Sequence, residues 1–226
     1  MRKDEHMDGH SFTLAGVGLM ALGSGALWWP DQQLLCVSDL HLGKSEHVLR
    51  RSGGLLPPYE THDTLARLTS DLDRLNARIV VCLGDSFDDP DAARALPDDQ
   101  KQWITRLQAG REWVWIEGNH DPGPVDLGGT HLSDLSLDGL VFRHVAEIAT
   151  RGEISGHYHP KVRIKTRGRA VSRPAFLADT ARVILPAYGT YTGGLRSDTK
   201  VLTDIMQENA LAFLTGASVH ALPMPR

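Results

Sequence analysis

Short apolar runs rich in β-branched and aromatic residues recur along the chain, and several of them end directly in Asp, Gly or His. Runs of this length, bounded by such residues, predict β-strands. We expect strands over residues 12–22, 26–29, 34–37, 79–83, 113–116, 140–142 and 153–155. Strands that stop at polar residues can present those residues together as a site.

Two segments between the strands carry apolar residues at helical spacing. Residues 59–76 place a leucine stripe on one face, and residues 98–109 carry a similar stripe before Gly110, which suits a helix end. Because strand and helix alternate through the first half, we expect crossover connections and partly parallel pairing. Later runs at residues 162–165, 174–177 and 181–185 are close enough for antiparallel hairpins. The pattern predicts an α/β domain of layered, mixed sheets.

The length and net charge of the chain limit the number of domains and the kinds of partner it can have. The 226 residues, of which 41% are hydrophobic, suffice for one compact domain but not for two. We expect a disordered tail over residues 1–10 and a single domain over residues 11–226. The net charge of −4 gives no global attraction to nucleic acid or to an acidic membrane, so any polyanion site must be local.

Cysteine usage and the N-terminal segment indicate a cytoplasmic protein. Cys36 and Cys82 lie singly inside apolar runs, which supports neither a disulfide framework nor a thiolate zinc site. The apolar stretch over residues 14–27 is too short for a membrane span, and we interpret its glycines as marks of a bent edge strand. Early acidic residues argue against a signal peptide. We therefore expect no membrane association.

Side chains able to bind metals follow two of the predicted inner strands. Asp39 and His41 come after residues 34–37, and on an extended segment alternate side chains point the same way, so both can hold one cation. Asp85 follows residues 79–83 and a glycine that permits close backbone approach, and Asp88 comes three residues later. Taken singly, each fragment is also typical of a turn that leaves a strand.

Two further strand ends carry similar side chains. Asn119, His120 and Asp121 follow residues 113–116 and offer an amide oxygen, an imidazole able to donate to a phosphoryl oxygen, and a carboxylate able to orient that imidazole. His157 and His159 follow residues 153–155 on alternate positions. Imidazole, carboxylate and amide ligands without thiolates suit Mn²⁺, Fe or Zn²⁺. Four such strand ends in one chain predict a metal site.

In this order the motifs resemble those of the calcineurin-like metallophosphoesterase superfamily, over residues 34 to 160. The resemblance implies a four-layer αββα sandwich of two mixed β-sheets flanked by helices. It also implies two divalent metal ions, with Mn²⁺ the first expectation, and a catalytic histidine at His120. One metal would take Asp39, His41, Asp85 and His159, and the other Asp85, Asn119, His157 and one more histidine.

Apart from His120, two histidines lie between Asn119 and His157, and these, His131 and His144, are the candidates for the remaining ligand. We select His144 because it follows the strand predicted at residues 140–142, whereas His131 lies in a Gly-rich loop. The glycine that the superfamily usually carries after this histidine is replaced by Val145.

Three segments resemble more closely the bacterial branch of the superfamily that is associated with DNA ligases in DNA repair. They are residues 40–44 (LHLGK), 84–87 (GDSF) and 185–194 (LPAYGTYTGG). This resemblance implies an endonuclease that acts on single-stranded or irregular DNA, with a repair ligase and a helicase as partners. No feature of the sequence specifies an oligomeric state.

The chemistry expected of such a centre is in-line attack by a metal-bridging hydroxide. His120 would stabilise the phosphoryl charge or protonate the leaving oxygen, and Asp121 would favour its imidazolium form. Basic residues alternate over residues 161–167, so Arg163 and Lys165 could face a phosphate backbone, although a solvated hairpin has the same pattern. Lys44 would add a positive charge near the scissile group.

Other functions are compatible with these motifs. A phosphatase or nucleotide phosphodiesterase with a small substrate would use the same metal motifs. A protein phosphatase is disfavoured, because Asp89 and Asp121 stand where such enzymes carry Arg and Glu. A metal-free scaffold on the same fold is disfavoured by the complete ligand set and by His120.

Overall fold

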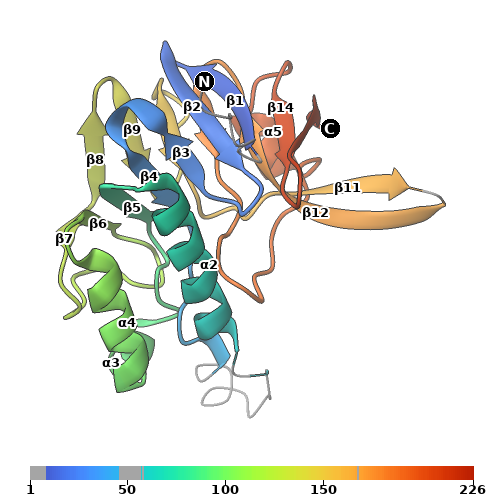
Figure 1. Ribbon diagram of the computed structural model, residues 1–226. Helices are drawn as coiled ribbons and strands as arrows, with labels where there is room; N and C mark the ends of the chain where they lie inside the picture. Colours follow the sequence, from blue (N-terminus) through green and yellow to red (C-terminus); the bar gives the residue numbers. More distant parts are fainter. Residues whose placement is uncertain (1–8, 46–56, 58, 167) are drawn as a thin grey trace, which may run out of the picture.

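The computed structural model describes residues 9–45, 57, 59–166 and 168–226. Within them, two β-sheets pack face to face with helices on their outer sides (Figure 1). The first sheet has the order β1-β2-β3-β4-β5-β6-β7. The second has the order β15-β14-β12-β13-β10-β9-β8, and β11 pairs with β12 off this path.

The first sheet is antiparallel at its start and parallel afterwards. Its strands are β1 (Gly9–Leu14), β2 (Val17–Leu22), β3 (Leu27–Trp29), β4 (Leu34–Val37), β5 (Ile79–Leu83), β6 (Glu112–Ile116) and β7 (Thr130–Leu132), with the short helix η1 (Pro30–Gln32) before β4. The strands from β4 to β7 run parallel. Their crossovers contain α2 (Glu60–Leu75), α3 (Pro90–Ala95) and α4 (Asp98–Gln108), as the alternation of strand and helix predicts.

The second sheet is mixed as well. It contains β8 (Asp134–Leu137), β9 (Leu140–Arg143), β10 (Glu153–Ser155), β11 (Lys161–Thr166), β12 (Arg169–Ala178), β13 (Arg182–Ile184), β14 (Leu211–Leu214) and β15 (His220–Pro223), with α5 (Lys200–Ile205) before β14. β10 is parallel to both β9 and β13, and the other pairs are antiparallel. In Figure 1 the β11–β12 hairpin extends away from the body of the molecule.

Three apolar clusters define four layers. The first joins α2 and α4 to the outer face of the first sheet, the second fills the space between the sheets, and the third joins the second sheet to α5. Successive residues alternate between clusters, as Leu35 and Cys36 do on β4. This arrangement confirms the αββα sandwich. Both cysteines are free, and no helix among the described residues has the length and apolar character needed to cross a membrane.

The N-terminal region differs from the sequence prediction. Residues 12–22 do not form one bent strand, because Ala15 (φ 49°) and Gly16 (φ 85°) make a tight turn between β1 and β2. Two consecutive positive φ values match the twist of a two-residue hairpin. The expected tail over residues 1–10 is also too long, since Gly9 and His10 pair with Leu22 and Ala21. Residues 1–8 lie outside the described part of the chain.

Candidate metal centre

The candidate ligands follow the carboxyl ends of five strands. Asp39 and His41 come after β4, Asp85 after β5, Asn119 after β6, His144 after β9, and His157 and His159 after β10. The first three strands belong to one sheet and the last two to the other. Because the sheets pack face to face, side chains that are far apart in sequence meet at one end of the sandwich.

Five of these residues have left-handed backbone conformations. They are Asp39 (φ 53°), His41 (φ 46°), Asp85 (φ 46°), His157 (φ 70°) and His159 (φ 45°). A left-handed conformation costs a non-glycine residue about 1–2 kcal/mol. Such conformations persist where the surrounding structure imposes them, and they concentrate at functional sites. Here the backbone between strand and loop is held in a shape that turns the side chains toward one another.

The first cluster consists of Asp39, His41 and His159. Nε2 of His159 lies 3.0 Å from Oδ1 of Asp39 and 3.4 Å from Nε2 of His41. Asp39 is fully buried, and its Oδ2 accepts a 2.5 Å hydrogen bond from the Ser38 hydroxyl and a 3.0 Å bond from the His157 backbone N–H. The three ligand atoms therefore surround one point.

The second cluster joins Asp85 with three other residues. Nε2 of His144 lies 3.3 Å from Oδ2 of Asp85 and 2.9 Å from Oδ1 of Asn119, and Nδ1 of His157 lies 3.1 Å from the same Nε2 atom. Burial alone would raise the pKa of Asp85, but the His144 imidazole and the His120 backbone N–H outweigh it and lower this pKa to about 2. Burial and the neighbouring His144 lower the pKa of His157, which favours its neutral, metal-binding form.

The hydrogen bonds of two histidines fit a cation in each cluster. Nδ1 of His41 lies 3.1 Å from Oδ1 of Asp88, and Nδ1 of His144 lies 2.8 Å from the Leu83 carbonyl. If each Nδ1 carries the proton and donates it, each Nε2 directs a lone pair into its cluster. Oδ1 of Asp39 is buried and receives no hydrogen bond from any described residue. Convergent lone pairs of this kind repel one another unless a cation binds them, so the residues fit two divalent metals.

Asp88 belongs to the centre but was not among the predicted site residues. It contacts His41 and also lies 3.5 Å from Nζ of Lys44. Together with His41 and His120 it forms a third group whose ligand atoms lie within 4.8 Å of one another. Its spacing of three residues after Asp85 is the signal in the sequence that could have identified it. The Asp88 contact also explains why Lys44 lies near the centre.

The side chains of His120 and Asp121 make different contacts. The His120 ring stands edge-on to His41, with centroids 5.3 Å apart, and its Nδ1 lies 2.9 Å from the Asp88 carbonyl oxygen. The expected contact between Asp121 and this imidazole is not formed, because the Asp121 carboxylate accepts four backbone N–H bonds, from Asp85, Ser86, Phe87 and Gly118. Asp121 therefore holds the turn that carries Asp85, and the His120 ring is oriented by a carbonyl group.

Of the two candidate histidines, the structure brings His144 into the centre. His131 lies on β7, where its ring stacks at 6.3 Å on Trp115. The loop expected around His131 is thus a short strand paired with β6. The role of His144 as a ligand stays a prediction, now supported by its distances to Asp85, Asn119 and His157.

The predicted substrate residues Arg163 and Lys165 are exposed on β11. They line a 340 Å³ depression together with Arg196 and Asp198. β11 begins two residues after His159, so this basic stripe leads outward from the centre. Arg167, the last residue of the predicted stripe, lies outside the described residues.

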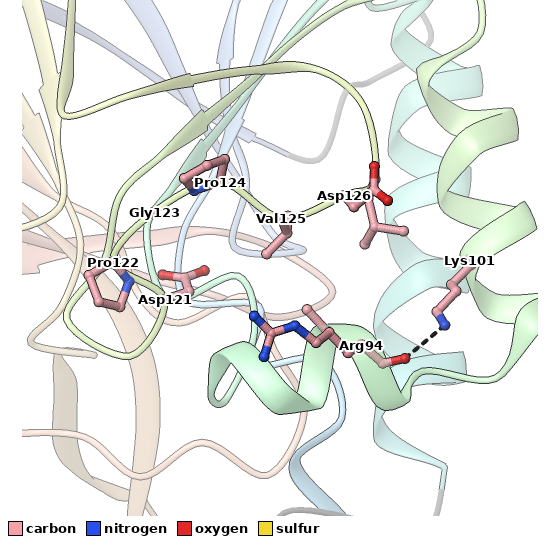
Figure 2. A pocket seen from close by; sticks show the side chains of 10 residues that line it. Arg94, Lys101, Asp121, Pro122, Gly123, Pro124, Val125 and Asp126 are labelled. Carbon is pink, nitrogen blue, oxygen red and sulfur yellow. Dashed lines mark hydrogen bonds between the residues drawn. The ribbon is translucent and has the colours of Figure 1, made fainter.

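Two hollows open beside the centre. One, of 380 Å³, is lined by Asn119 and His144. The other, of 680 Å³, is lined by residues 121–127 and by Arg94 and Lys101. Figure 2 shows the Arg94 guanidinium directed toward Asp121, whereas the Lys101 ammonium is turned to the Arg94 carbonyl, 2.8 Å away. The smaller hollow therefore gives access to Asn119 and His144 of the second cluster.

Comparisons with known proteins agree with this geometry. The family model described as calcineurin-like phosphoesterase matches residues 33–209. The crystal structure of the Pseudomonas putida nuclease MPE is similar, with a TM-score of 0.72 and 28% sequence identity, over 95% of this chain and 100% of that chain. A search of curated proteins gave no significant match. Because the family model covers most of the chain and the metal-binding side chains converge, the chain belongs to the calcineurin-like phosphoesterase family and is a metal-dependent phosphoesterase.

Proposed function

We propose that the protein is a binuclear, Mn²⁺-dependent phosphodiesterase that cleaves DNA internally. The observation that carries the proposal is the pair of ligand clusters, in which carboxylate, amide and imidazole groups converge from both sheets. The similarity to a bacterial nuclease over nearly the whole chain supports a nucleic-acid substrate. Fe and Zn²⁺ are alternatives to Mn²⁺ because the ligand set suits all three.

Each residue has a defined part in this proposal. Asp39, His41 and His159 hold one metal, Asn119, His144 and His157 hold the other, and Asp85 lies between them. When bound, two divalent cations polarise the phosphoryl group and lower the pKa of a coordinated water toward neutrality. In its imidazolium form, His120 donates from its Nε2 to a phosphoryl or leaving oxygen while its Nδ1–H donates to the Asp88 carbonyl.

The substrate we propose is single-stranded or irregular DNA. Arg163 and Lys165 lie on the exposed side of β11 and are spaced to follow a phosphate backbone. Lys44 adds a cation beside Asp88 at the edge of the centre. From the resemblance to the ligase-associated branch we further propose a role in DNA repair in the cytoplasm, with a ligase and a helicase as partners.

A substrate panel tests the proposal. The protein is stripped of metal, loaded with Mn²⁺ and assayed on single-stranded DNA, duplex DNA, phosphomonoesters and cyclic nucleotides. Cleavage inside circular single-stranded DNA that chelator abolishes and Mn²⁺ restores is the expected result. Hydrolysis of monoesters or cyclic nucleotides alone would instead assign a small-molecule substrate.

Metal analysis provides an independent readout. We expect about two metal ions per chain after reconstitution. A chain that binds no metal and shows no activity with added Mn²⁺ would be the metal-free scaffold that the motifs also allow.

A further inference from the structure

A cavity of 420 Å³ lies at the base of the β11–β12 hairpin and is not used by the proposed chemistry. Its walls come from α2, from the β2–β3 turn, from the first residue of β11, from β12 and from the loop over residues 186–192. We call it the hairpin-base cavity.

The hairpin-base cavity is strongly cationic. Arg67, Lys161 and Arg173 line it, and no Asp or Glu is among its lining residues in the described part of the chain. This contrasts with the whole chain, in which 28 acidic residues outnumber 24 basic ones. Nε of Arg67 is buried and has no hydrogen-bond partner among the described residues. Three cations without a carboxylate favour an anionic ligand.

One wall of the cavity carries an exposed aromatic ring. Tyr191 is 42% exposed and has a left-handed backbone, with φ at 61°. The loop on which it stands is held to α2, because the Tyr188 hydroxyl donates to Asp71 at 3.0 Å and the Thr190 hydroxyl donates to Asp63 at 2.6 Å. An exposed aromatic ring on a fixed loop next to cations is the combination that binds single-stranded nucleic acid.

The same loop connects the cavity to the metal centre. The backbone N–H groups of Tyr188 and Gly189 donate to the carbonyls of Ser38 and Asp39, at 2.7 and 3.0 Å. A Cβ atom at Gly189 would lie 2.1 Å from the Leu40 carbonyl oxygen, so only glycine permits this approach. The cavity wall is thus bonded directly to the strand end that carries Asp39 and His41.

We propose that the hairpin-base cavity binds a backbone phosphate of single-stranded DNA next to the scissile phosphodiester, with an adjacent base stacked on Tyr191. Arg173 and Lys161 would contact the phosphate, and Arg67 would support it from α2. The identity of the strand rests on the proposed function, whereas the affinity of the cavity for a phosphodiester does not.

Binding of oligothymidylates of increasing length tests the cavity without relying on cleavage. Labelled strands are titrated onto metal-loaded protein with the His120→Ala substitution, and binding is followed by fluorescence anisotropy. Affinity should rise once the strand can reach both the centre and the cavity. Arg173→Gln and Tyr191→Ser should each remove this rise and weaken binding of the longer strands about tenfold.

Controls separate a ligand contact from a change in fold or net charge. Arg106→Gln removes one charge from the exposed end of α4 and should leave binding unchanged. Arg173→Gln should lower the slope of log affinity against log salt concentration by about 0.7, the value for one phosphate contact on a single strand. Arg173→Lys should restore most of that slope.

The outcomes distinguish the two proposals. A protein with native His120 that cuts no DNA would refute the proposed function, while the titration would still decide whether the cavity binds a phosphodiester. Unchanged affinity in both cavity variants, or equal weakening by Arg106→Gln, would overturn the cavity proposal. Selective weakening of long strands, with short strands and a small aryl phosphodiester unaffected, would establish it.

Discussion

His120 and Asp121 are neighbours in the chain, yet they act on different parts of the centre. The imidazole of His120 is directed by the Asp88 carbonyl, and the Asp121 carboxylate is surrounded by backbone N–H groups. A sequence motif gives the kinds of side chain and their order. It does not give their rotamers, and the rotamers decide which atom each side chain meets.

Replacement of His120 by alanine should lower turnover about 100- to 10,000-fold while metal content stays unchanged. The reason is that its ring bonds to a backbone carbonyl and stands beside His41, so it can reach a substrate oxygen without serving as an essential ligand. Steady-state kinetics on a DNA substrate together with elemental analysis provide the measurement. Near-normal turnover with full metal content would show that His120 does not act in catalysis.

His144→Ala and His131→Ala form a matched pair for the second metal. We expect His144→Ala to lose one metal ion per chain and most activity, because its Nε2 contacts Asp85 and Asn119. His131→Ala should retain both ions, since its ring packs on Trp115. Metal content after dialysis is the measurement, and equal loss in the two variants would contradict the assignment.

Most of the site could be predicted at the residue scale because its members follow strands. His144 was chosen over His131 for that reason alone, and the structure places it among the other candidates. Asp88 was missed as a site residue because its side chain reaches His41 from within a loop. Its spacing after Asp85 marks it as a candidate, but a position inside a loop has no periodicity that shows where its side chain points.

At the scale of elements, the turn after β5 depends on a carboxylate from the next strand end. Oδ1 of Asp121 accepts N–H bonds from Asp85 and Gly118, and Oδ2 accepts them from Ser86 and Phe87. These four N–H groups all use the Asp121 carboxylate as their hydrogen-bond acceptor. The shape of the turn, and with it the position of Asp85, is therefore set by Asp121.

Asp121→Asn should destabilise the protein by about 1–3 kcal/mol, because the amide NH₂ would face two backbone donors that lose their acceptor. Activity should fall as well, since Asp85 moves with the turn. Urea unfolding of the metal-free protein measures the first effect. Asp126→Asn, at an exposed position of the same loop, is the control and should unfold like the wild type.

A buried pair of charged residues, one on β10 and one on β13, predicts a pH effect on stability. Glu153 is fully buried and lies 3.8 Å from Arg182, and burial raises the pKa of Glu153 above its usual value. A carboxyl group with a raised pKa in the folded state contributes stability below its unfolded pKa, and this contribution is lost as the pH rises through the folded pKa.

Glu153→Gln should therefore gain stability relative to the wild type as the pH rises from about 4.5 toward neutrality. The free energies of unfolding of both proteins in urea, measured across this range, give the difference. Glu208→Gln, at an exposed position, should show a constant difference. A difference that falls with rising pH would contradict the expected pKa shift.

Most elements with continuous apolar runs were predicted closely, but the apolar strand β14 and several short polar elements were missed. β4 and β5 have the expected bounds because both of their faces are buried. β7, β8 and β15 carry mostly exposed or half-buried residues, and α5 has only six residues, so neither apolar periodicity nor length identifies them. These elements exist because neighbouring strands and the second sheet supply their partners.

At the scale of the molecule, the alternation of strand and helix predicts layered mixed sheets but not how two sheets face each other. The four-layer arrangement was inferred from the motifs that the chain shares with a known superfamily. Local patterns do not specify which sheets stack, because stacking depends on apolar faces that each sheet acquires only after its strands pair.

Charge reversal at Arg163 and Lys165 tests whether the basic residues of β11 contact the DNA substrate. The double variant should lose much more activity on DNA than on a small aryl phosphodiester, and its DNA binding should depend less on salt. The control is charge reversal at Arg106 and Arg151, which are exposed elsewhere. Equal losses on both substrates would show that the basic residues of β11 do not contact the DNA.

Each ligand cluster takes residues from both sheets, as Asp39 and His159 show for the first and Asp85 and His157 for the second. A metal bound in either cluster would therefore cross-link the two sheets of the sandwich. Because ions that bind only the closed sandwich stabilise it by mass action, metal supply would govern the lifetime of the folded chain as well as its activity. The catalytic centre and the inter-sheet core would be lost together.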